Sequence, residues 1–324
     1  MSLPSGRSEV ITLSPSASVG DLKLATQRAF GQRYLRLAGP QGRLLDPTKS
    51  LELNGLKDGD SIAAIALQPK IVASSSAFVM WCVGGDRIVT WGSDQPVRNQ
   101  PINVQQIQSS THAFAAIMGD GSVVTWGNPE HGGRSEAVRD QLRNVQQLKA
   151  TNGAFAAILA DQTVVTWGNT KFAADCTRVR DQLKGVQQIQ ASGAAFAAIL
   201  GDGRVVTWGR QDCGGDSSTV RHRLRNVRQI EATSTSFAAI LEDGSVVTWG
   251  WTGGDNFRVQ HELRSVQQIS STKSAFAAIL ADQSVVTWGD PHGGGDSTEV
   301  QDQLKKVAAW RFQLFCYCPS KGFS

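Results

Sequence analysis

The sequence predicts a mainly β, repetitive architecture that follows a small α+β domain, and three observations support this prediction. The dipeptide Trp-Gly recurs six times, at spacings of 35, 41, 41, 41 and 39 residues. A phenylalanine that opens an apolar run recurs in the same phase, and in several units an Asp-Gly pair separates this run from the next. The expected repeat core is Phe78, Phe114, Phe155, Phe196, Phe237 and Phe276 with Trp91, Trp126, Trp167, Trp208, Trp249 and Trp288.

Each unit has the pattern of a β-hairpin with a further strand before it. In residues 196–208 two apolar runs flank Asp202-Gly203, and glycine accepts the positive φ that a type I′ turn requires. Residues 186–189 read as the preceding strand, and a short strand is expected near 220–224, so a unit has three or four strands. A residue other than glycine at the turn is expected to be strained or to change the turn type. Such residues are Gln162 and Gln283.

Strands that are apolar on both faces need cover on both sides. A ring of blades provides this cover, and the alanine pairs allow close approach while Phe, Ile and Trp fill the wider gaps. We therefore predict a β-propeller over residues 70–306, with six visible blades and six or seven in the ring. A β-solenoid is the structural alternative. From Val307 the pattern dissolves, and we interpret 307–324 as a divergent tail or a partial seventh repeat.

The order V-x-Q-I, small polar residues, D-G-x-V and W-G resembles the repeat of the regulator of chromosome condensation family. This resemblance implies a β-propeller, usually of seven blades. The chain departs from the family at two places. Only His112 comes near the family's usual histidine, and Gly-Gly-Asp replaces the loop Gly-Gln-Leu-Gly. We expect Gly-Gly-Asp to form a tight turn between blades.

Residues 1–69 differ in composition and predict a small β-grasp domain. The pattern L-R-L-A-G, L-L-D and S-L-E-L over residues 8–68 resembles the ubiquitin-like family. The segment lacks a terminal Gly-Gly, and Arg36 stands where ubiquitin presents its main exposed aliphatic side chain, so neither conjugation nor the usual receptor contact is implied. The expected elements are strand 9–14, helix 19–30, and strands 34–37, 43–45 and 61–67.

Composition excludes several classes of protein. No apolar run approaches the length of a membrane-spanning helix and no signal peptide is visible, so we expect a cytoplasmic or nuclear protein without a membrane partner. The five cysteines include no C-x-x-C pair, which suits reduced thiols. The net charge of +4 comes without a basic run, which disfavours nucleic acid and chromatin as partners. No catalytic motif, cofactor motif or metal-ligand spacing is present, so no enzymatic activity, cofactor or metal is expected.

We expect a non-catalytic protein–protein interaction scaffold or adaptor. The segments after each Trp-Gly vary between units while the strands repeat, and variable loops on a rigid frame form recognition surfaces. Two alternatives stay open: a substrate-recognition arm of a HECT-type ubiquitin ligase pathway protein, and a guanine-nucleotide exchange factor for a small GTPase. The expected partners are therefore other proteins, with ubiquitin-pathway components and a small GTPase as candidates. The candidate interaction residues are His131, Arg134, Lys171, Asp216, Asp255, His292 and Asp296.

Overall fold

The chain forms two compact units, Met1–Ile107 and Gln108–Ser324. The computed structural model describes residues 8–305 except 15, 84, 86, 93–102 and 252–255. The predicted tail and partial seventh repeat at 307–324 lie outside these residues. No helix in the described part of the chain is long and apolar enough to cross a lipid bilayer.

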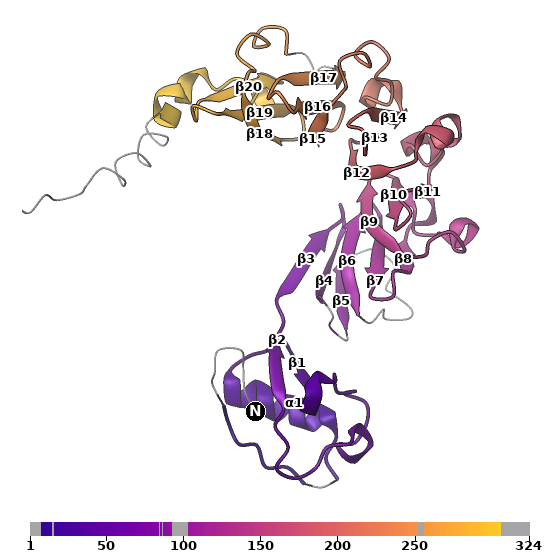
Figure 1. Ribbon diagram of the computed structural model, residues 1–324, viewed down its shortest axis with the longest axis vertical. Helices are drawn as coiled ribbons and strands as arrows, with labels where there is room; N and C mark the ends of the chain where they lie inside the picture. Colours follow the sequence, from indigo (N-terminus) through magenta and orange to yellow (C-terminus); the bar gives the residue numbers. More distant parts are fainter. Residues whose placement is uncertain are drawn as a thin grey trace, which may run out of the picture. The chain divides into compact units, whose positions relative to one another are not determined.

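The first unit begins with a small module built on one helix (Figure 1). Helix α1 (Val19–Phe30) starts in a capping box, in which the Asp21 amide donates to Ser18 Oγ at 3.1 Å and the Ser18 amide donates to Asp21 Oδ2 at 2.8 Å. The helix ends at Gly31, whose φ is 66°. Its apolar face packs on the antiparallel pair β1 (Leu35–Ala38) and β2 (Ala63–Ala66). The predicted helix and these two strands are confirmed.

Two predicted strands of this module do not form. Residues 9–14 have no ladder partner within the described residues, although Ile11 and Leu13 still contact the small core. Residues 43–45 reduce to an isolated bridge between Leu44 and Ala38. A strand needs a neighbour to satisfy its backbone groups, and local sequence pattern does not supply one. The ubiquitin-like resemblance therefore stays a prediction.

The remaining strands form six three-stranded antiparallel sheets, each made of consecutive strands. The mainly β, repetitive architecture is confirmed, with three strands per repeat. The expected fourth strand near 220–224 forms turns instead, in which the Leu224 amide donates to the Val220 carbonyl at 3.2 Å. We number the sheets as blades in chain order: blade one is β3 (Pro69–Ala73), β4 (Ala77–Cys82) and β5 (Ile88–Gly92), and blade two is β6 (Val104–Ser109), β7 (Ala113–Met118) and β8 (Val123–Gly127). Blade three is β9 (Val145–Ala150), β10 (Ala154–Leu159) and β11 (Val164–Gly168), and blade four is β12 (Val186–Ala191), β13 (Ala195–Leu200) and β14 (Val205–Gly209). Blade five is β15 (Val227–Ala232), β16 (Ser236–Leu241) and β17 (Val246–Gly250), and blade six is β18 (Val266–Ser271), β19 (Ala275–Leu280) and β20 (Val285–Gly289).

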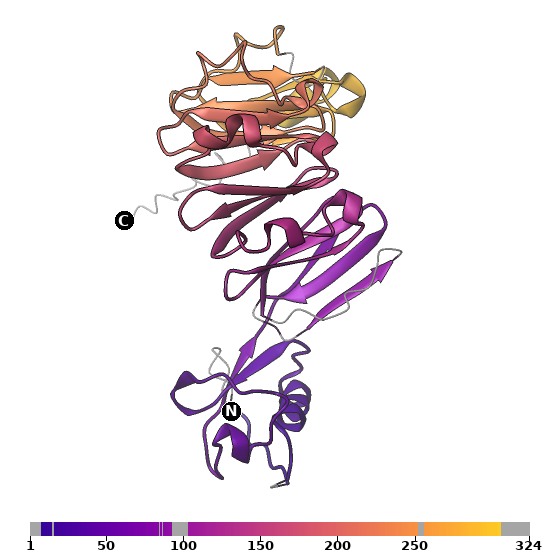
Figure 2. The ribbon, with the colours of Figure 1, turned by 90° about the vertical axis from the view of Figure 1, so that its right-hand side faces the viewer.

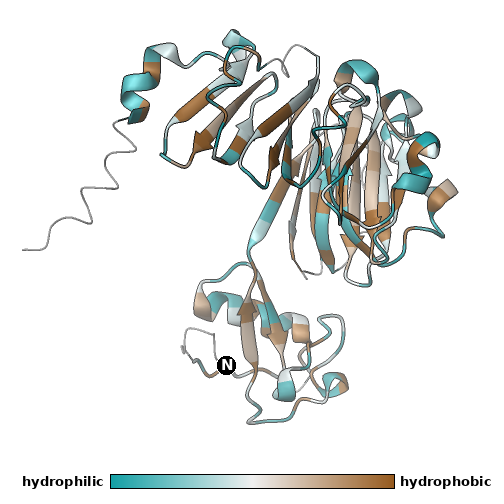
Figure 3. Ribbon diagram, turned by 45° about the horizontal axis from the view of Figure 1, so that its top comes forward, coloured by the Kyte–Doolittle hydropathy of each residue, from teal (hydrophilic) through white to brown (hydrophobic). Residues whose placement is uncertain are grey.

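Within the second unit, successive blades stack face to face (Figure 2). Because side chains alternate along a strand, β13 sends Phe196 and Ala198 to one face and Ala197 and Ile199 to the other. The first face, here called the back face, packs on the preceding blade; the second, the front face, packs on the following blade. The same front-to-back packing joins blades two and three and blades five and six. Apolar strands and hydrophilic loops alternate accordingly (Figure 3).

Each blade carries the predicted aromatic pair in register. Phe196 lies opposite Trp208, and their rings stack at 5.2 Å. Five of the six pairs are buried, with exposures of at most 7%. The pair in blade one, Phe78 and Trp91, keeps its stack but is 44% and 46% exposed, because no preceding blade covers it among the described residues of its unit.

The hairpin turns keep their geometry where glycine is replaced. Gln162 and Gln283 have φ values of 64° and 70°, close to the 74° of Gly203. The turn type is therefore conserved within the chain, and the expected strain falls on the two glutamines.

Candidate functional site

In blades two, three and six the loop after Trp-Gly begins with a residue whose side chain caps a short 3-10 turn. Asn128, Asn169 and Asp290 each accept a hydrogen bond from the amide two residues later, at 2.8, 2.9 and 3.0 Å. Short polar side chains suit this role because they reach the backbone directly. The same position holds Arg210 in blade four and Trp251 in blade five, and neither side chain can accept such a bond.

The two Gly-Gly-Asp segments that lie within the described residues, 214–216 and 294–296, form tight turns, as expected. Gly214 has a φ of 86°, and a Cβ added to Gly215 would lie 2.4 Å from the Gly209 backbone. The following aspartate holds the turn: Asp216 accepts from the Ser218 amide at 2.8 Å, and Asp296 accepts from the Thr298 amide at 2.9 Å. Both aspartates are nevertheless exposed, so each retains capacity to accept bonds from a ligand.

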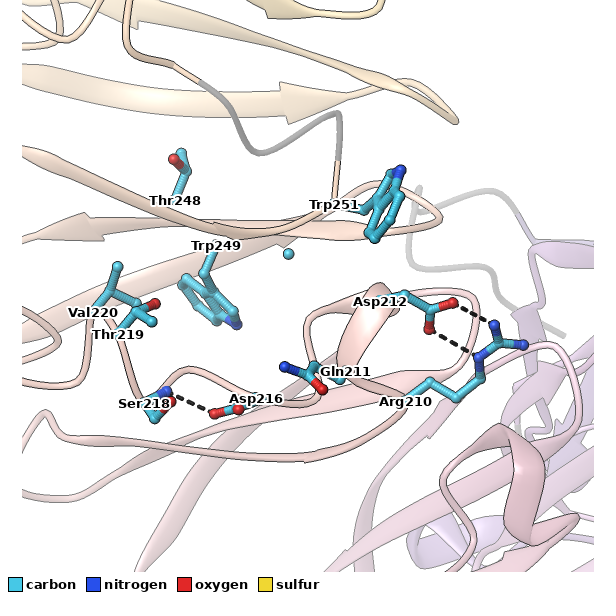
Figure 4. Close-up of a pocket in the computed structure, with 11 residues that line it drawn as sticks. Arg210, Gln211, Asp212, Asp216, Ser218, Thr219, Val220, Thr248, Trp249 and Trp251 are labelled. Carbon is cyan, nitrogen blue, oxygen red and sulfur yellow. Dashed lines mark hydrogen bonds and ion pairs between the residues drawn. The ribbon is translucent and has the colours of Figure 1, made fainter.

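One groove in the second unit combines these features (Figure 4). It lies between the loop of blade four and the outer strand of blade five, and it encloses about 900 Å³. One wall is the segment from Arg210 to Val220, and the other is the segment from Thr248 to Trp251. Its lining residues are Arg210, Gln211, Asp212, Asp216, Ser218, Thr219, Val220, Thr248, Trp249, Gly250 and Trp251.

The two indoles of this groove have different roles. Trp249 is 5% exposed, and its Nε1–H donates to the Gly214 carbonyl at 3.0 Å, so this ring belongs to the blade interface. Trp251 is 61% exposed. Its backbone is nonetheless held at both ends, because its amide donates to the Thr235 carbonyl at 3.0 Å and its carbonyl accepts from Ser236 Oγ at 3.0 Å. The protein thus presents an indole to solvent from an anchored backbone.

Charged groups line the opposite wall. Arg210 Nε donates to Asp212 Oδ1 at 2.9 Å, and Arg210 Nη2 makes a second bond to Oδ2. This hydrogen bonding with Arg210 lowers the pKa of Asp212 and raises that of Arg210. Asp216 adds a second carboxylate, so the groove carries one net negative charge. The groove therefore contains an exposed indole and an uncompensated carboxylate, and both of these groups attract cations.

The structure distributes the sequence-predicted residues over several blades. Asp216 lines the groove just described, and Asp296 lines a second groove of about 690 Å³ between the loop of blade five and the outer strand of blade six. Arg134, Lys171 and His292 are exposed on separate loops and do not converge. Asp255 lies outside the described residues.

His131 is partly buried and packs edge-on against His112, with ring centroids 4.9 Å apart. Its Nδ1 is buried without a hydrogen-bond partner among the described residues. This placement makes His131 part of the packing between loops as well as a candidate for contact.

The sequence placed Arg210 and Asp212 in a variable segment after Trp-Gly, but neither these two residues nor Trp251 was among the candidate interaction residues. A signal for Trp251 was present, because this residue follows Trp-Gly directly at the position where three other units have Asn or Asp. Because an aromatic side chain cannot cap the turn, a tryptophan at this position indicates a role other than capping.

Neither the protein-family models nor the curated proteins include a match to this chain. Among solved structures, the Physcomitrella patens receptor kinase CR4 ectodomain is similar over 68% of this chain and 61% of its own length, at 16% identity and a TM-score of 0.44. Human WBSCR16 is similar over 80% of this chain and 89% of its own, at 15% identity and a TM-score of 0.47. Yeast RCC1 (Prp20), in the structure with Kap60 bound to it, is similar over 89% and 85%, at 13% identity and a TM-score of 0.47. The blade architecture rests on the sheets and interlocking faces of the chain itself.

Proposed function

We propose that this chain is a non-catalytic protein-interaction scaffold and that the groove beside Trp251 receives a positively charged side chain of a partner protein. The exposed, anchored indole of Trp251 is the observation that carries the proposal. Aromatic residues are enriched where proteins bind one another, because they bury a large apolar area at a small cost in conformational entropy.

The chemistry of the groove favours a cation over a neutral group. A lysine or arginine side chain placed on the indole face gains cation–π attraction, and the carboxylate of Asp216 in the same groove adds electrostatic attraction for a positive charge. Arg210 already neutralises Asp212, which leaves Asp216 as the uncompensated charge. Ser218 and Thr219 supply hydroxyl groups for the partner's backbone.

The neighbouring groove provides an internal comparison. It has the same place between a loop and the outer strand of the next blade, but the residue after Trp-Gly is the capping Asp290. That groove presents no exposed indole among its lining residues. Binding that depends on Trp251 should therefore be confined to the groove between blades four and five.

A titration followed by NMR tests the proposal. The indole Nε1–H signals of the full chain are observed while N-acetylarginine amide is added, and N-acetylglutamine amide serves as the neutral control. We expect the Trp251 signal, assigned by its loss in Trp251→Phe, to shift with arginine and not with glutamine. Asp216→Asn should weaken binding at least about threefold, in keeping with the loss of one exposed charge. Asp296→Asn, the equivalent substitution in the loop of blade six, should leave binding unchanged.

Two results would contradict the proposal. Equal shifts with both amides would show that the groove has no preference for a cation. An unaltered affinity in Asp216→Asn would show that the carboxylate of Asp216 does not contribute to binding. The non-catalytic part has its own test, in which the full chain is added to a ubiquitin-transfer assay and to nucleotide-release assays with small GTPases. Acceleration of either reaction would support one of the alternatives instead.

A further inference from the structure

Two histidines of blade two meet outside the groove beside Trp251. His112 is the last residue of the turn between β6 and β7, and His131 is the last residue of a short 3-10 helix (Pro129–His131) in the loop after β8. Both residues are partly buried, and their rings meet edge-on with centroids 4.9 Å apart and planes at 89°. Two imidazoles from separate segments of the chain therefore converge at one place.

The backbone of each histidine is held in position. The Asn128 amide donates to the His112 carbonyl at 2.8 Å, and the His131 amide donates to the Asn128 carbonyl at 3.1 Å. The Ser110 hydroxyl donates to the His131 carbonyl at 2.8 Å. These bonds fix the segments that present the two imidazoles, and a preorganised pair is what a ligand site requires.

The other blades show that the fold does not need histidine at these positions. A bond from a serine or threonine hydroxyl to the loop carbonyl, as from Ser110 to His131, recurs in blades three, four and six and identifies the equivalent residues. The equivalent pairs are Gly153 with Phe172, Ala194 with Cys213, and Ser274 with Gly293. Since these loops fold with such different side chains, packing alone does not explain two adjacent histidines in blade two.

The separation of the two rings suits a shared metal ion. Zinc–imidazole bonds are about 2.0–2.1 Å long, which places each ring centroid about 3 Å from the ion. Two such rings at a tetrahedral angle lie about 5 Å apart, close to the 4.9 Å between His112 and His131. In addition, Nδ1 of His131 is buried without a hydrogen-bond partner among the described residues. A buried polar atom without a partner costs free energy, and a bound metal ion would remove this cost.

We propose that His112 and His131 together bind one divalent transition-metal ion, and we expect this ion to be zinc. Imidazole suits Zn²⁺, Cu²⁺ and Ni²⁺, whereas Mg²⁺ and Ca²⁺ prefer oxygen ligands. Two protein ligands leave coordination positions for water. The sequence did not predict this site, because the two histidines are far apart in the chain and only folding brings them together. The inference goes beyond the proposed function and does not depend on it.

A zinc titration of the full chain, followed by NMR of the histidine Cε1–H signals, tests the proposal. The chain has five histidines, and each signal is assigned by its loss in a variant that lacks that histidine. We expect the signals of His112 and His131 to change together, with one dissociation constant, and we expect magnesium to leave both unchanged. Because cysteine thiolates also bind zinc, following the individual imidazoles separates this site from zinc held by thiols.

Two substitutions copy residues that other blades have at the same positions, so these variants are expected to fold. His112→Ala copies Ala194, and His131→Phe copies Phe172. Each should raise the zinc dissociation constant measured at the remaining histidine at least about tenfold, since loss of even an outer-shell partner of a metal ligand costs this much. His292→Asn, in the corresponding loop of blade six, is the control and should leave binding unchanged. Circular dichroism checks folding, and His112→Asn and His131→Asn replace any variant that does not fold.

Three results would overturn the proposal. If neither signal changed at about 1 mM zinc, the two rings would only pack against each other. Different dissociation constants for His112 and His131 would show that they do not share one ion. An unaltered zinc affinity at His131 in His112→Ala would show that His112 is not a ligand.

Discussion

The indole Nε1–H of Trp208 donates to the backbone carbonyl of Ala173, 3.2 Å away and 35 residues earlier in the chain. Trp167 and Trp249 make the same bond to Gly132 and Gly214, at 3.1 and 3.0 Å. In blades three, four and five the tryptophan that marks the repeat is therefore also a hydrogen-bond donor to the loop of the preceding blade, whereas the buried Nε1–H of Trp288 in blade six has no partner among the described residues. In these three blades one indole both fills the space between blades and forms a hydrogen bond through its N–H, as is usual for a buried tryptophan.

Trp208→Phe should separate these two contributions. Phenylalanine keeps a ring against Phe196 but leaves the Ala173 carbonyl without its donor, so we expect a loss of about 1–3 kcal/mol in the free energy of unfolding. Trp208→Ala should cost about 3–5 kcal/mol because it also leaves a cavity. Urea denaturation measures both, and Trp251→Phe is the exposed control. A thermal midpoint that did not move in Trp208→Ala would contradict the buried assignment.

Ser192 holds the loop of blade four to its middle strand. Its hydroxyl donates to the Cys213 carbonyl at 2.7 Å and accepts from the Ala195 amide at 3.1 Å. Ser192→Ala should destabilise the protein by about 1–3 kcal/mol, since two buried backbone groups lose their partner. Ser192→Thr should be tolerated, because Thr151 makes the same two contacts in blade three. Equal midpoints for the alanine and threonine variants in chemical denaturation would refute this role.

The hairpin turns predict opposite effects for two substitutions. Gln162→Gly should stabilise the protein by up to about 1 kcal/mol, because it relieves a left-handed backbone with a φ of 64°. Gly203→Gln should destabilise it by more than this, since an added Cβ would lie 2.8 Å from the Asn226 Cα. Thermal unfolding of both variants provides the measurement, and changes of the same sign would be inconsistent with the explanation.

Acid should weaken the turns through their aspartates. Hydrogen bonds from the side chain and amide of Thr163 lower the pKa of Asp161 below its ordinary value of 3.8, and Ser284 does the same for Asp282. A carboxylate with a lowered pKa in the folded state stabilises that state above 3.8, and this contribution is lost as the pH falls through the lowered value.

We therefore expect the thermal midpoint to fall between pH 5 and pH 2.5. Asp161→Asn, Asp282→Asn and the double variant should show a progressively smaller decrease, because asparagine still accepts the hydrogen bond but does not titrate. Asp140→Asn changes an exposed aspartate outside the turns and serves as the control. An unchanged pH dependence in the double variant would show that other groups cause the acid sensitivity.

Elements defined by short-range pattern were predictable. The helix at Val19–Phe30 and its capping box could be read from neighbouring residues, as could the hairpins and the positive φ at Gln162. The prediction of a strand at 9–14 was wrong, because a strand depends on a partner elsewhere in the chain and not on short-range pattern alone. The site was partly predictable: Asp216 was among the candidates, while the importance of Trp251 emerged when the loop of blade four was found to face it.

The repeat itself follows from the amino-acid sequence, since each blade is a local unit whose hydrophobic pattern and turn residues lie within about 25 consecutive positions. Exposure does not follow in this way. Trp91 and Trp208 end nearly identical strands, yet one is 46% exposed and the other 4%. The difference arises because the cover for a back face comes from another blade, so its burial depends on which faces meet in space and not on the residues beside it in the chain.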